Sequence, residues 1–521
     1  MKSCGWMNFG LPRRLFSAAL VLLLAGAGGT AAADEPLPEL VLDTTRITVS
    51  GISSGAYMAV QFGTVHSGAV SGVAATAGGP YFCAGGNTWG GLAVGGVMAR
   101  CMQGDPDYPA TPITAAHRAQ MEANTRDWAA QGRIDPLDGL ARQRVWIFHG
   151  YNDGIVKRPV SDALADWYSA FVPQHQVFYR NDLNAAHGQI SAACAAPQAG
   201  ANCNVCAQTG GNFINHCADR ATGAADYDAA GAALQLFHGP LQRTPTAALT
   251  GRVLSFDQTP YVRRGDSPLA PARASMGQTG YLYLPAACAA GQPCRLHVAF
   301  HGCQQYAGRI GTAFVDHAGF NEWADANRIA VLYPQAADSM PTLFAPTRPI
   351  NPNGCWDWWG YNDFLFDPAG RYATRDGLQI AAVWRMVQRL AGGGSAGVPA
   401  TPASGTPVPQ LADVSATRVV LVWTPVAGAA GYRIVRSGAG EPEVLGGGSV
   451  DGPSFVDTGL APATAYRYRI HVLDAAGAEG PPSAELAVTT AAAAPACDPY
   501  YSLAQDRPVD ARNRPTAAVC P

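Results

Sequence analysis

The stretch RITVSGISSGAYMAVQF at residues 46–62 decides the fold of this chain. Its first residues are β-prone, and the apolar spacing after Gly55 is typical of a helix. Between them, the pattern Gly-x-Ser-x-Gly around Ser53 predicts a sharp strand-to-helix turn, because the two small glycines let the backbone turn tightly and expose a serine hydroxyl. Ser53 is therefore a candidate nucleophile, and the residues alone leave a plain turn open.

A second copy of the pattern lies at residues 393–397, inside a Gly/Ser/Pro stretch. A chain with 59 glycines is expected to contain such chance matches. No strand-like run precedes Ser395 and no helical pattern follows it, so the context rejects this copy.

Composition bounds the class of protein. At 521 residues the chain is too long for one compact core, so we expect two to four domains. The formal charge of -3 and the 14% of charged residues give no electrostatic basis for binding nucleic acid. We therefore expect no polyanionic partner.

Residues 1–33 are typical of a secretory signal peptide. Basic residues come first, at Lys2, Arg13 and Arg14. An apolar run follows at 20–27, and Ala31-Ala32-Ala33 then provides a cleavage site. The Arg13-Arg14 pair hints at twin-arginine export, but adjacent arginines are common in any basic n-region, so we favour general secretion. Because no second long apolar span follows, we expect no membrane insertion and a secreted product, extracellular or periplasmic.

Cysteine usage predicts disulfides. Of 13 cysteines, Cys4 leaves with the signal, and an even number in an exported chain favours pairing. Short loops predict the bridges Cys83 with Cys101, Cys288 with Cys294, Cys303 with Cys355, Cys497 with Cys520, and two more among Cys194, Cys203, Cys206 and Cys217. Cys203, Cys206, His216 and Cys217 could instead hold zinc, but the ligand spacing is poor, so we predict no metal and no cofactor.

The chain divides into a large and a small domain. From residue 34 to 391, buried-looking strands alternate with helical stretches, which favours an α/β sheet. Residues 392–407 are rich in Gly, Ala, Ser, Thr and Pro and predict a solvated linker.

Short alternating strands occupy 408–490 and predict an all-β sandwich. Trp423 in an early strand and Leu460-x-Pro462-x-Thr464-x-Tyr466 before a late one resemble the core tryptophan and tyrosine corner of fibronectin type III modules. That resemblance implies a spacer or binder. Residues 491–521 form a short tether and tail that a Cys497 to Cys520 bridge could close.

Two loops after strands supply the partners that a nucleophilic serine needs. The run 145–148 leads to Asp153, and the run 176–179 leads to His187. Such loops meet at the carboxyl edge of a parallel sheet. The order Ser53, Asp153, His187 is the α/β-hydrolase order, and the spacing of the last two accommodates one helix and one strand. We predict a Ser-His-Asp triad.

Two other histidines compete for the role of base. His175 begins a strand rather than following one, and His238 lies beyond an Ala-rich, helix-like segment. Both fit less well than His187.

An oxyanion needs two N–H donors, and the amide of Ser54 supplies the first. The strand 296–300 leads into His301-Gly302-Cys303-Gln304-Gln305, a His-Gly loop of the type that shapes oxyanion holes in esterases. In ordinary α/β-hydrolases this loop precedes the nucleophile, whereas here it follows the triad. The order predicts a circularly permuted α/β-hydrolase domain.

Several segments together resemble extracellular poly(3-hydroxybutyrate) depolymerases of the permuted type. They are 50–90, the loop around Asp153, 215–241, 301–305 and Cys355-Trp356-Asp357-Trp358-Trp359-Gly360-Tyr361. The resemblance implies Ser53, Asp153 and His187 as the triad, with the amides of Ser54 and Cys303 as the oxyanion hole. It also implies a terminal polymer-binding domain, but the tail after Ala496 is much shorter than the family's usual one.

Trp358 and Trp359 have two interpretations. They could be core residues, since tryptophan buries a large apolar area. Alternatively, one of them lines an ester-binding cleft, tied to the oxyanion loop through Cys355 and Cys303.

The resemblance implies a serine esterase that depolymerises poly(3-hydroxybutyrate), with the water-insoluble polyester and its oligomers as partners. We expect the chain to be a monomer. Two alternatives stay open: a secreted feruloyl or acetyl-xylan esterase, and a non-catalytic adhesion protein.

Overall fold

A computed structural model describes residues 36–85, 97–104, 113–194, 203–219, 224–362, 370–392, 405–438 and 440–493, and the backbone of 500–502 and 507–509. The expected signal peptide, most of the linker and the Cys497 to Cys520 bridge lie outside these residues. Within them, no helix has the length and apolar character that a bilayer crossing requires.

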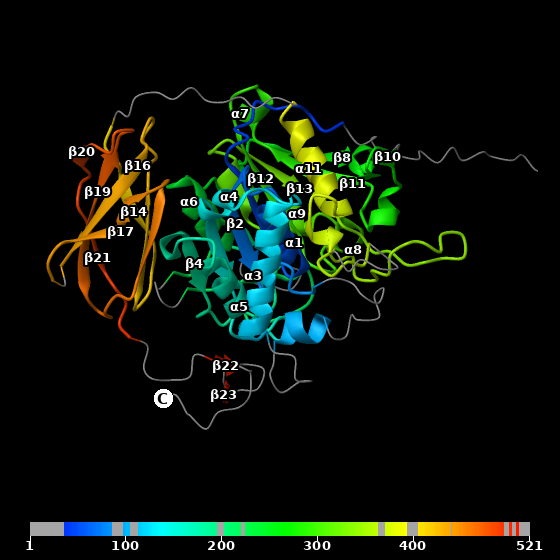
Figure 1. The fold of residues 1–521 in the computed structure, drawn as a ribbon, viewed down its shortest axis with the longest axis horizontal. Helices are drawn as coiled ribbons and strands as arrows, with labels where there is room; N and C mark the ends of the chain where they lie inside the picture. The colour runs from blue at the N-terminus through cyan, green and yellow to red at the C-terminus, as the bar shows by residue number, and fades with distance from the viewer. Residues whose placement is uncertain are drawn as a thin grey trace, which may run out of the picture. The chain divides into compact units, whose positions relative to one another are not determined.

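An eight-stranded sheet forms the centre of the large domain (Figure 1). In spatial order its strands are β4 (Val177–Arg180), β3 (Arg144–Phe148), β2 (Val70–Thr76), β1 (Ile47–Ile52), β12 (Arg295–Phe300), β13 (Ile329–Tyr333), β11 (Thr279–Leu284) and β8 (Arg252–Asp257). The first six run parallel, β11 pairs antiparallel with β13, and β8 pairs antiparallel with β11. The expected α/β class is confirmed.

The strand order agrees with the predicted circular permutation. Strands from the first part of the chain, β1 to β4, form one side of the sheet, and strands from the later part, β8, β11, β12 and β13, form the other. The two sides join where β1 pairs with β12, with Val49 opposite Val298. The candidate nucleophile strand and the strand before the oxyanion loop are therefore neighbours, although about 250 residues separate them in sequence.

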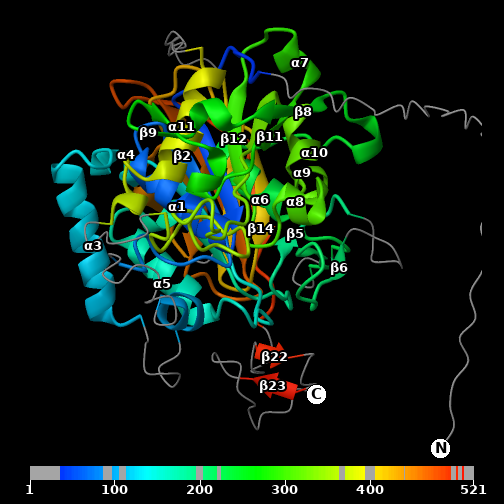
Figure 2. The same ribbon diagram turned by 90° about the vertical axis from the view of Figure 1, so that its right-hand side faces the viewer.

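Helices cover both faces of this sheet because its strands are buried on both sides. One face packs on α1 (Ser54–Val65), α3 (Ala115–Ala130), α5 (Arg158–Ser169) and α11 (Leu378–Leu390). The other packs on α6 (Ala229–His238), α9 (Ala313–His317) and α10 (Phe320–Ala324). Figure 2 shows α3 and α5 on one side and α9 and α10 on the other.

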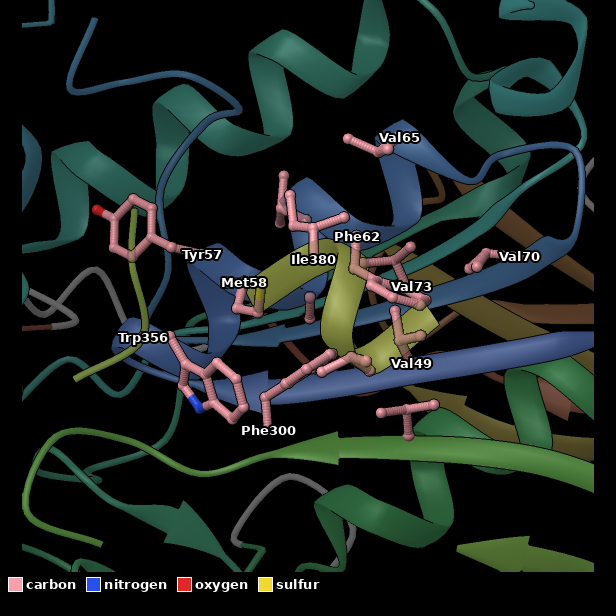
Figure 3. Close-up of a cluster of buried hydrophobic side chains, with 14 of the residues drawn as sticks. Val49, Tyr57, Met58, Phe62, Val65, Val70, Val73, Phe300, Trp356 and Ile380 are labelled. Atoms are coloured by element: carbon pink, nitrogen blue, oxygen red, sulfur yellow. The ribbon is translucent and has the colours of Figure 1, made fainter. Parts of the chain in front are cut away.

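The two cores follow from alternation along each strand. Val49 and Val298 belong to the core under α1 and α11, whereas Ala299 belongs to the opposite one. Figure 3 shows part of the first core, in which Phe62 of α1 lies close to Phe300 of β12. Trp356 packs there against Phe300 with ring centroids 5.1 Å apart.

The smaller domain is a two-sheet β-sandwich, as predicted. One sheet contains β14 (Pro409–Val414), β15 (Arg418–Trp423) and β18 (Ser454–Thr458), and the other contains β16 (Gly431–Ser437), β17 (Glu443–Val450), β19 (Ala465–Leu473), β20 (Glu479–Pro482) and β21 (Leu486–Thr489). Trp423 is fully buried in its core. The hydroxyl of Tyr466 accepts a hydrogen bond from the Ala461 amide at 2.9 Å, which is the expected tyrosine corner.

The sandwich contacts the edge of the large sheet. The buried Arg180, the last residue of β4, pairs with Asp219 of its own domain and with Asp413 of the sandwich. Arg418 in turn donates to the carbonyl oxygen of Tyr179 at 2.8 Å. Because β4 also leads to the loop of His187, the module contacts a strand that positions a candidate site residue.

Candidate active site

Ser53 lies at the turn between β1 and α1, in the strained backbone conformation φ 55°, ψ -123°. The flanking glycines are sterically required. A Cβ on Gly51 would lie 2.1 Å from the carbonyl oxygen of Gly55, and a Cβ on Gly55 would lie 2.2 Å from that of Phe300. This is the geometry of a nucleophile elbow, in which the strand, the turn and the helix all have the predicted positions.

Asp153 and His187 meet beside this turn. They follow β3 and β4, and the Nδ1 atom of His187 lies 2.7 Å from Oδ2 of Asp153. The other carboxylate oxygen accepts from the amides of Ile155 and Val156 at 2.8 and 3.0 Å. Asp153 is therefore fixed on both oxygens, and the Nε2 atom of His187 is left for another partner.

Electrostatics keep the Asp153 carboxyl ionised. Burial raises the pKa of this carboxyl. The electrostatic attraction of His187 and its hydrogen bond to the carboxylate lower the pKa by more, so it lies below its ordinary value. A buried carboxylate in this position fixes the orientation and tautomer of the imidazole and stabilises its protonated form.

The His187 loop is held by a polar and disulfide-linked frame. Asn215 is completely buried, and its side-chain amide donates to the carbonyl oxygens of Ala186, Cys206 and Gln208. Bridges Cys194–Cys203 and Cys206–Cys217 close the same region.

These bridges bear on the zinc site that the sequence left as an alternative. All four cysteines of the group are paired, so the zinc alternative is wrong. Sequence reasoning missed Asn215 as a positioning residue. The available signal was an asparagine two residues before a disulfide cysteine, which is too common a pattern to be specific.

The competing histidines lie elsewhere. His175 stacks on Phe455 of the sandwich, and His238 is buried at the end of α6, where burial lowers its pKa well below the ordinary value. Neither residue lines the cavity that contains Ser53 and His187.

The loop after β12 lies on the other side of Ser53 and is extensively braced. The side-chain oxygen of Gln305 accepts from the Gly302 amide at 2.7 Å, and its nitrogen donates to the carbonyl oxygens of Asn212 and Phe213. The Cys303–Cys355 bridge fixes the loop to the segment 355–361, which contains the tryptophans. The other two bridges predicted from short loops, Cys83–Cys101 and Cys288–Cys294, are also present.

Two backbone amides are available to bind an anion. Among the described residues, the amides of Ser54 and Cys303 donate to no protein acceptor. Ser54 is the first residue of α1, where helix geometry leaves N–H groups free. Both residues line the cavity beside Ser53. The arrangement is compatible with an oxyanion hole.

The cavity has a volume of about 200 Å³ and mostly apolar walls. Both predicted tryptophans line it. Trp358 stacks on Tyr57 with ring centroids 4.4 Å apart, and Trp359 packs edge-on against Trp358. Trp358 is buried and also lines the cavity, so its position is compatible with both the core and the cleft interpretation. The apolar wall residues that sequence reasoning missed include Met98, Met102, Ile155, Val156 and Phe213.

A serine at a strand-to-helix elbow, with a carboxylate–imidazole pair after the next strands of a mostly parallel sheet, defines the α/β-hydrolase class. No protein-family model matches the chain. The chain is, however, 34% identical over 478 residues to the poly(3-hydroxybutyrate) depolymerase of Delftia acidovorans, covering 90% of this chain and 84% of that protein. It is 31% identical over 384 residues to the polyhydroxybutyrate depolymerase of Talaromyces funiculosus, covering 73% of this chain and 99% of that protein.

Solved structures agree. A PHB depolymerase complexed with an R3HB trimer superposes with a TM-score of 0.55 at 31% identity, covering 69% of this chain and 99% of that one. The PHB depolymerase from Penicillium funiculosum gives 0.54 at 30% identity. The chain therefore belongs to the poly(3-hydroxybutyrate) depolymerase family and is a carboxylic ester hydrolase.

Proposed function

We propose that the chain is a secreted enzyme that depolymerises poly(3-hydroxybutyrate) through an acyl-enzyme on Ser53. The observation that carries the proposal is an apolar cavity lined by both Ser53 and His187, with Asp153 hydrogen-bonded behind the imidazole. Beside the serine lie two amides that donate to no acceptor among the described residues. The relatives named for this polymer support the substrate class.

The first half-reaction forms the acyl-enzyme. Nε2 of His187 takes the proton of the Ser53 hydroxyl while Oγ attacks the ester carbonyl carbon. The carbonyl oxygen becomes an oxyanion, and the Ser54 and Cys303 amides stabilise it. The C–O bond to the leaving hydroxyl end of the polymer then breaks, and protonated His187 returns the proton to that alcohol.

The second half-reaction frees the enzyme. Water loses a proton to His187 and attacks the acyl carbon, a second oxyanion forms at the same amides, and Ser53 leaves with the proton from His187. Asp153 stays ionised throughout and stabilises the imidazolium formed in each half-reaction.

The cavity walls suit an uncharged polyester. Apart from the reacting groups and the loop amides, the lining consists mainly of apolar and aromatic side chains, among them Trp358, Trp359 and Ile155. Such walls are stabilised by burying the methyl and methylene groups of a polyester, and the lining residues that the structure describes include no Lys or Arg for a charged ester.

The decisive experiment measures clearing of a poly(3-hydroxybutyrate) suspension by the purified mature chain and by Ser53→Ala. We expect clearing by the first and none by the second, with products identified by mass spectrometry. Feruloyl ester hydrolysis without polymer clearing would favour the esterase alternative, and ester turnover unchanged in Ser53→Ala would remove that residue from the mechanism.

We further propose export, cleavage before Asp34 and a monomeric state. The five disulfides among the described residues support an oxidising compartment. N-terminal sequencing of protein recovered from culture medium and light scattering of the purified chain test these points.

A further inference from the structure

Another cavity, of about 460 Å³, lies at the edge of the large sheet opposite the candidate active site. The parallel strands lead to Ser53, Asp153 and His187 at their carboxyl ends, so their amino ends form the opposite edge. Residues at these amino ends line the cavity, and the sandwich segments 425–432 and 451–453 complete its wall. This cavity and the one beside Ser53 have no lining residue in common.

Arginines gather at this amino edge. Arg46 directly precedes β1, Arg144 and Arg295 are the first residues of β3 and β12, and Arg142 lies two residues before β3. All four line the cavity, and Asp451 is the only acidic residue among the described residues that do so. Because parallel strands begin at the same edge of a sheet, arginines from distant parts of the chain meet here.

Neighbouring acids neutralise this positive charge only in part. Arg46 lies 3.8 Å from Asp43, and Arg142 pairs with Asp138 at 3.0 Å. The arginine side chains of these pairs are 64% and 55% exposed, and ion pairs in such positions are weak. Burial and the charges of Arg46 and Arg328 lower the pKa of Arg295, so this arginine would be stabilised by an added negative charge.

Arg144 is buried with an unsatisfied guanidinium group. It is 6% exposed, and its Nε atom donates to the Ser454 hydroxyl at 2.8 Å. Its Nη2 atom has no acceptor among the described residues. Burial lowers the pKa of Arg144 to about 10, which leaves the group charged at neutral pH. A buried cation with an unused donor is destabilising unless an anion pairs with it.

A second buried polar atom in the same cavity lacks a partner. His238 is 6% exposed, and its Nε2 atom has no hydrogen-bond partner among the described residues. Burial, together with the charges of Arg295 and other basic neighbours, lowers the pKa of His238 well below its ordinary value. The ring is therefore neutral, and the tautomer protonated at Nε2 is a hydrogen-bond donor.

The contact between the two domains contains a contrasting arginine. Arg180 is equally buried, but its guanidinium pairs with Asp182, Asp219 and Asp413 at 2.8, 2.7 and 3.1 Å. Arg144 forms no ion pair with a carboxylate among the described residues. Since buried charges are normally paired, the difference indicates that the partner of Arg144 comes from outside the chain.

We propose that this cavity binds a small oxyanion, a carboxylate or a phosphate, with Arg144 and Arg295 as its main ligands. The planar guanidinium fork of arginine matches the paired oxygens of both anions. One source is inorganic phosphate. The other is the proposed reaction, because each ester hydrolysis leaves a free carboxylate on one product. The site itself goes beyond the proposed function, since none of its residues lines the catalytic cavity.

The test is isothermal titration calorimetry of the purified mature chain at low ionic strength, with inorganic phosphate and 3-hydroxybutyrate titrated separately. We expect one anion to bind per chain. Arg144→Gln and Arg295→Gln should each weaken binding about tenfold or more, because each removes a charge-assisted hydrogen bond. Arg295 is less buried than Arg144, so Arg295→Gln decides the question if Arg144→Gln does not fold.

The matched control is Arg385→Gln, which removes the same charge from a different cavity of about 450 Å³. The Arg385 side chain donates to the Tyr261 carbonyl oxygen at 3.1 Å, and its loss should leave anion affinity unchanged. An equal loss of affinity in this control would overturn the inference in favour of a general effect of charge.

The two anions distinguish the sources. Binding of phosphate alone would support the site and assign it to an inorganic ion, and binding of 3-hydroxybutyrate alone would support it and assign it to a reaction product. Binding of neither, or unchanged affinity in Arg295→Gln, would overturn the inference and leave the arginines a purely structural role. Turnover of a soluble ester by the parent chain reports separately on the proposed function.

Discussion

The two sides of the cavity place their functional groups in different ways. The side built from β1 to β4 offers side chains, namely Ser53, Asp153 and His187, each at a strand end. The side that follows β12 offers a backbone amide at Cys303 and apolar rings at Trp358 and Trp359.

This difference determines what a mutation can reveal. A side-chain function is deleted by substituting its own residue. A backbone amide keeps its N–H in almost every substitution, so its role is tested only by loosening the groups that hold it, such as Gln305 and the Cys303–Cys355 bridge. Substitutions on the first side should abolish a chemical group, whereas substitutions on the second side should only displace one and have smaller effects.

The largest effect is expected on the side-chain side. Asp153→Asn should lower kcat by about 10⁴-fold, because a neutral amide favours the wrong imidazole tautomer and cannot stabilise the imidazolium. Steady-state kinetics on a soluble ester measure it. The near-identical shape of asparagine should leave the thermal midpoint within a few degrees, and a loss of activity below tenfold would contradict the role of this carboxylate.

Removing the Cys303–Cys355 bridge should have the next largest effect. These cysteines are 52 residues apart, and replacing both with alanine should cost about 4 kcal/mol of unfolding free energy by the chain-entropy relation and also reduce kcat. The matched control replaces Cys288 and Cys294, which are 6 residues apart and away from the cavity. That pair should cost about 2 kcal/mol and leave kcat unchanged. An equal loss of kcat in both double variants would show that the Cys303–Cys355 bridge has no special effect on the cavity.

Buried His301 predicts a pH-dependent stability. Burial lowers its pKa from 6.5 to about 4, and its Nε2 accepts from the Ala336 amide at 3.1 Å. The unfolded chain therefore binds the proton first, and stability that is complete above pH 6.5 is lost as the pH falls toward 4, by about 3 kcal/mol in total. Denaturant unfolding of the parent and of His301→Gln at pH 7.5 and 4.5 should show a flatter dependence in the variant. Parallel pH profiles would contradict this assignment.

Gln305→Ala should give the smallest effect. It removes three hydrogen bonds that join the loop at Gly302 to the backbone at Asn212 and Phe213, across the two sides of the cavity. We expect kcat to fall about 10- to 100-fold with KM nearly unchanged, since in the proposed mechanism the displaced Cys303 amide stabilises the transition state. The control is Gln143→Ala, which loses two buried hydrogen bonds, to the carbonyl oxygens of Gly63 in α1 and Val70 in β2, and whose side chain does not line the cavity. A comparable loss of kcat in the control would show a general packing effect.

Local patterns predicted the side-chain half of the site. The glycines around Ser53 and the strand-like runs before Asp153 and His187 are short-range signals, and the structure has those strands and turns where they were expected. Disulfide partners within short loops were predicted for the same reason, because chain proximity limits the choices.

The supporting residues could not be predicted in this way. Asn215 and Gln305 each have at least one partner far along the chain, at separations of 29 residues to Ala186 and 93 residues to Asn212, and Met98 lies in the wall of the cavity. An isolated Asn, Gln or Met has no local pattern that marks such a position. The exposure of Leu343 and Phe344 was missed as well, because a Leu-Phe pair in sequence is more often a buried one.

By itself, the sequence determined the alternation of strands and helices, the elbow at Ser53 and the all-β character of residues 408–490. It also determined the permuted order, in which the 301–305 loop follows Ser53, Asp153 and His187. These features depend on backbone preferences and on contacts between near neighbours. Only the tertiary structure decided that β1 pairs with β12, which of the tryptophans face the cavity, and which apolar side chains stay in solvent. Those outcomes depend on packing between segments hundreds of residues apart, where the free energy belongs to the assembled core and not to any one stretch of chain.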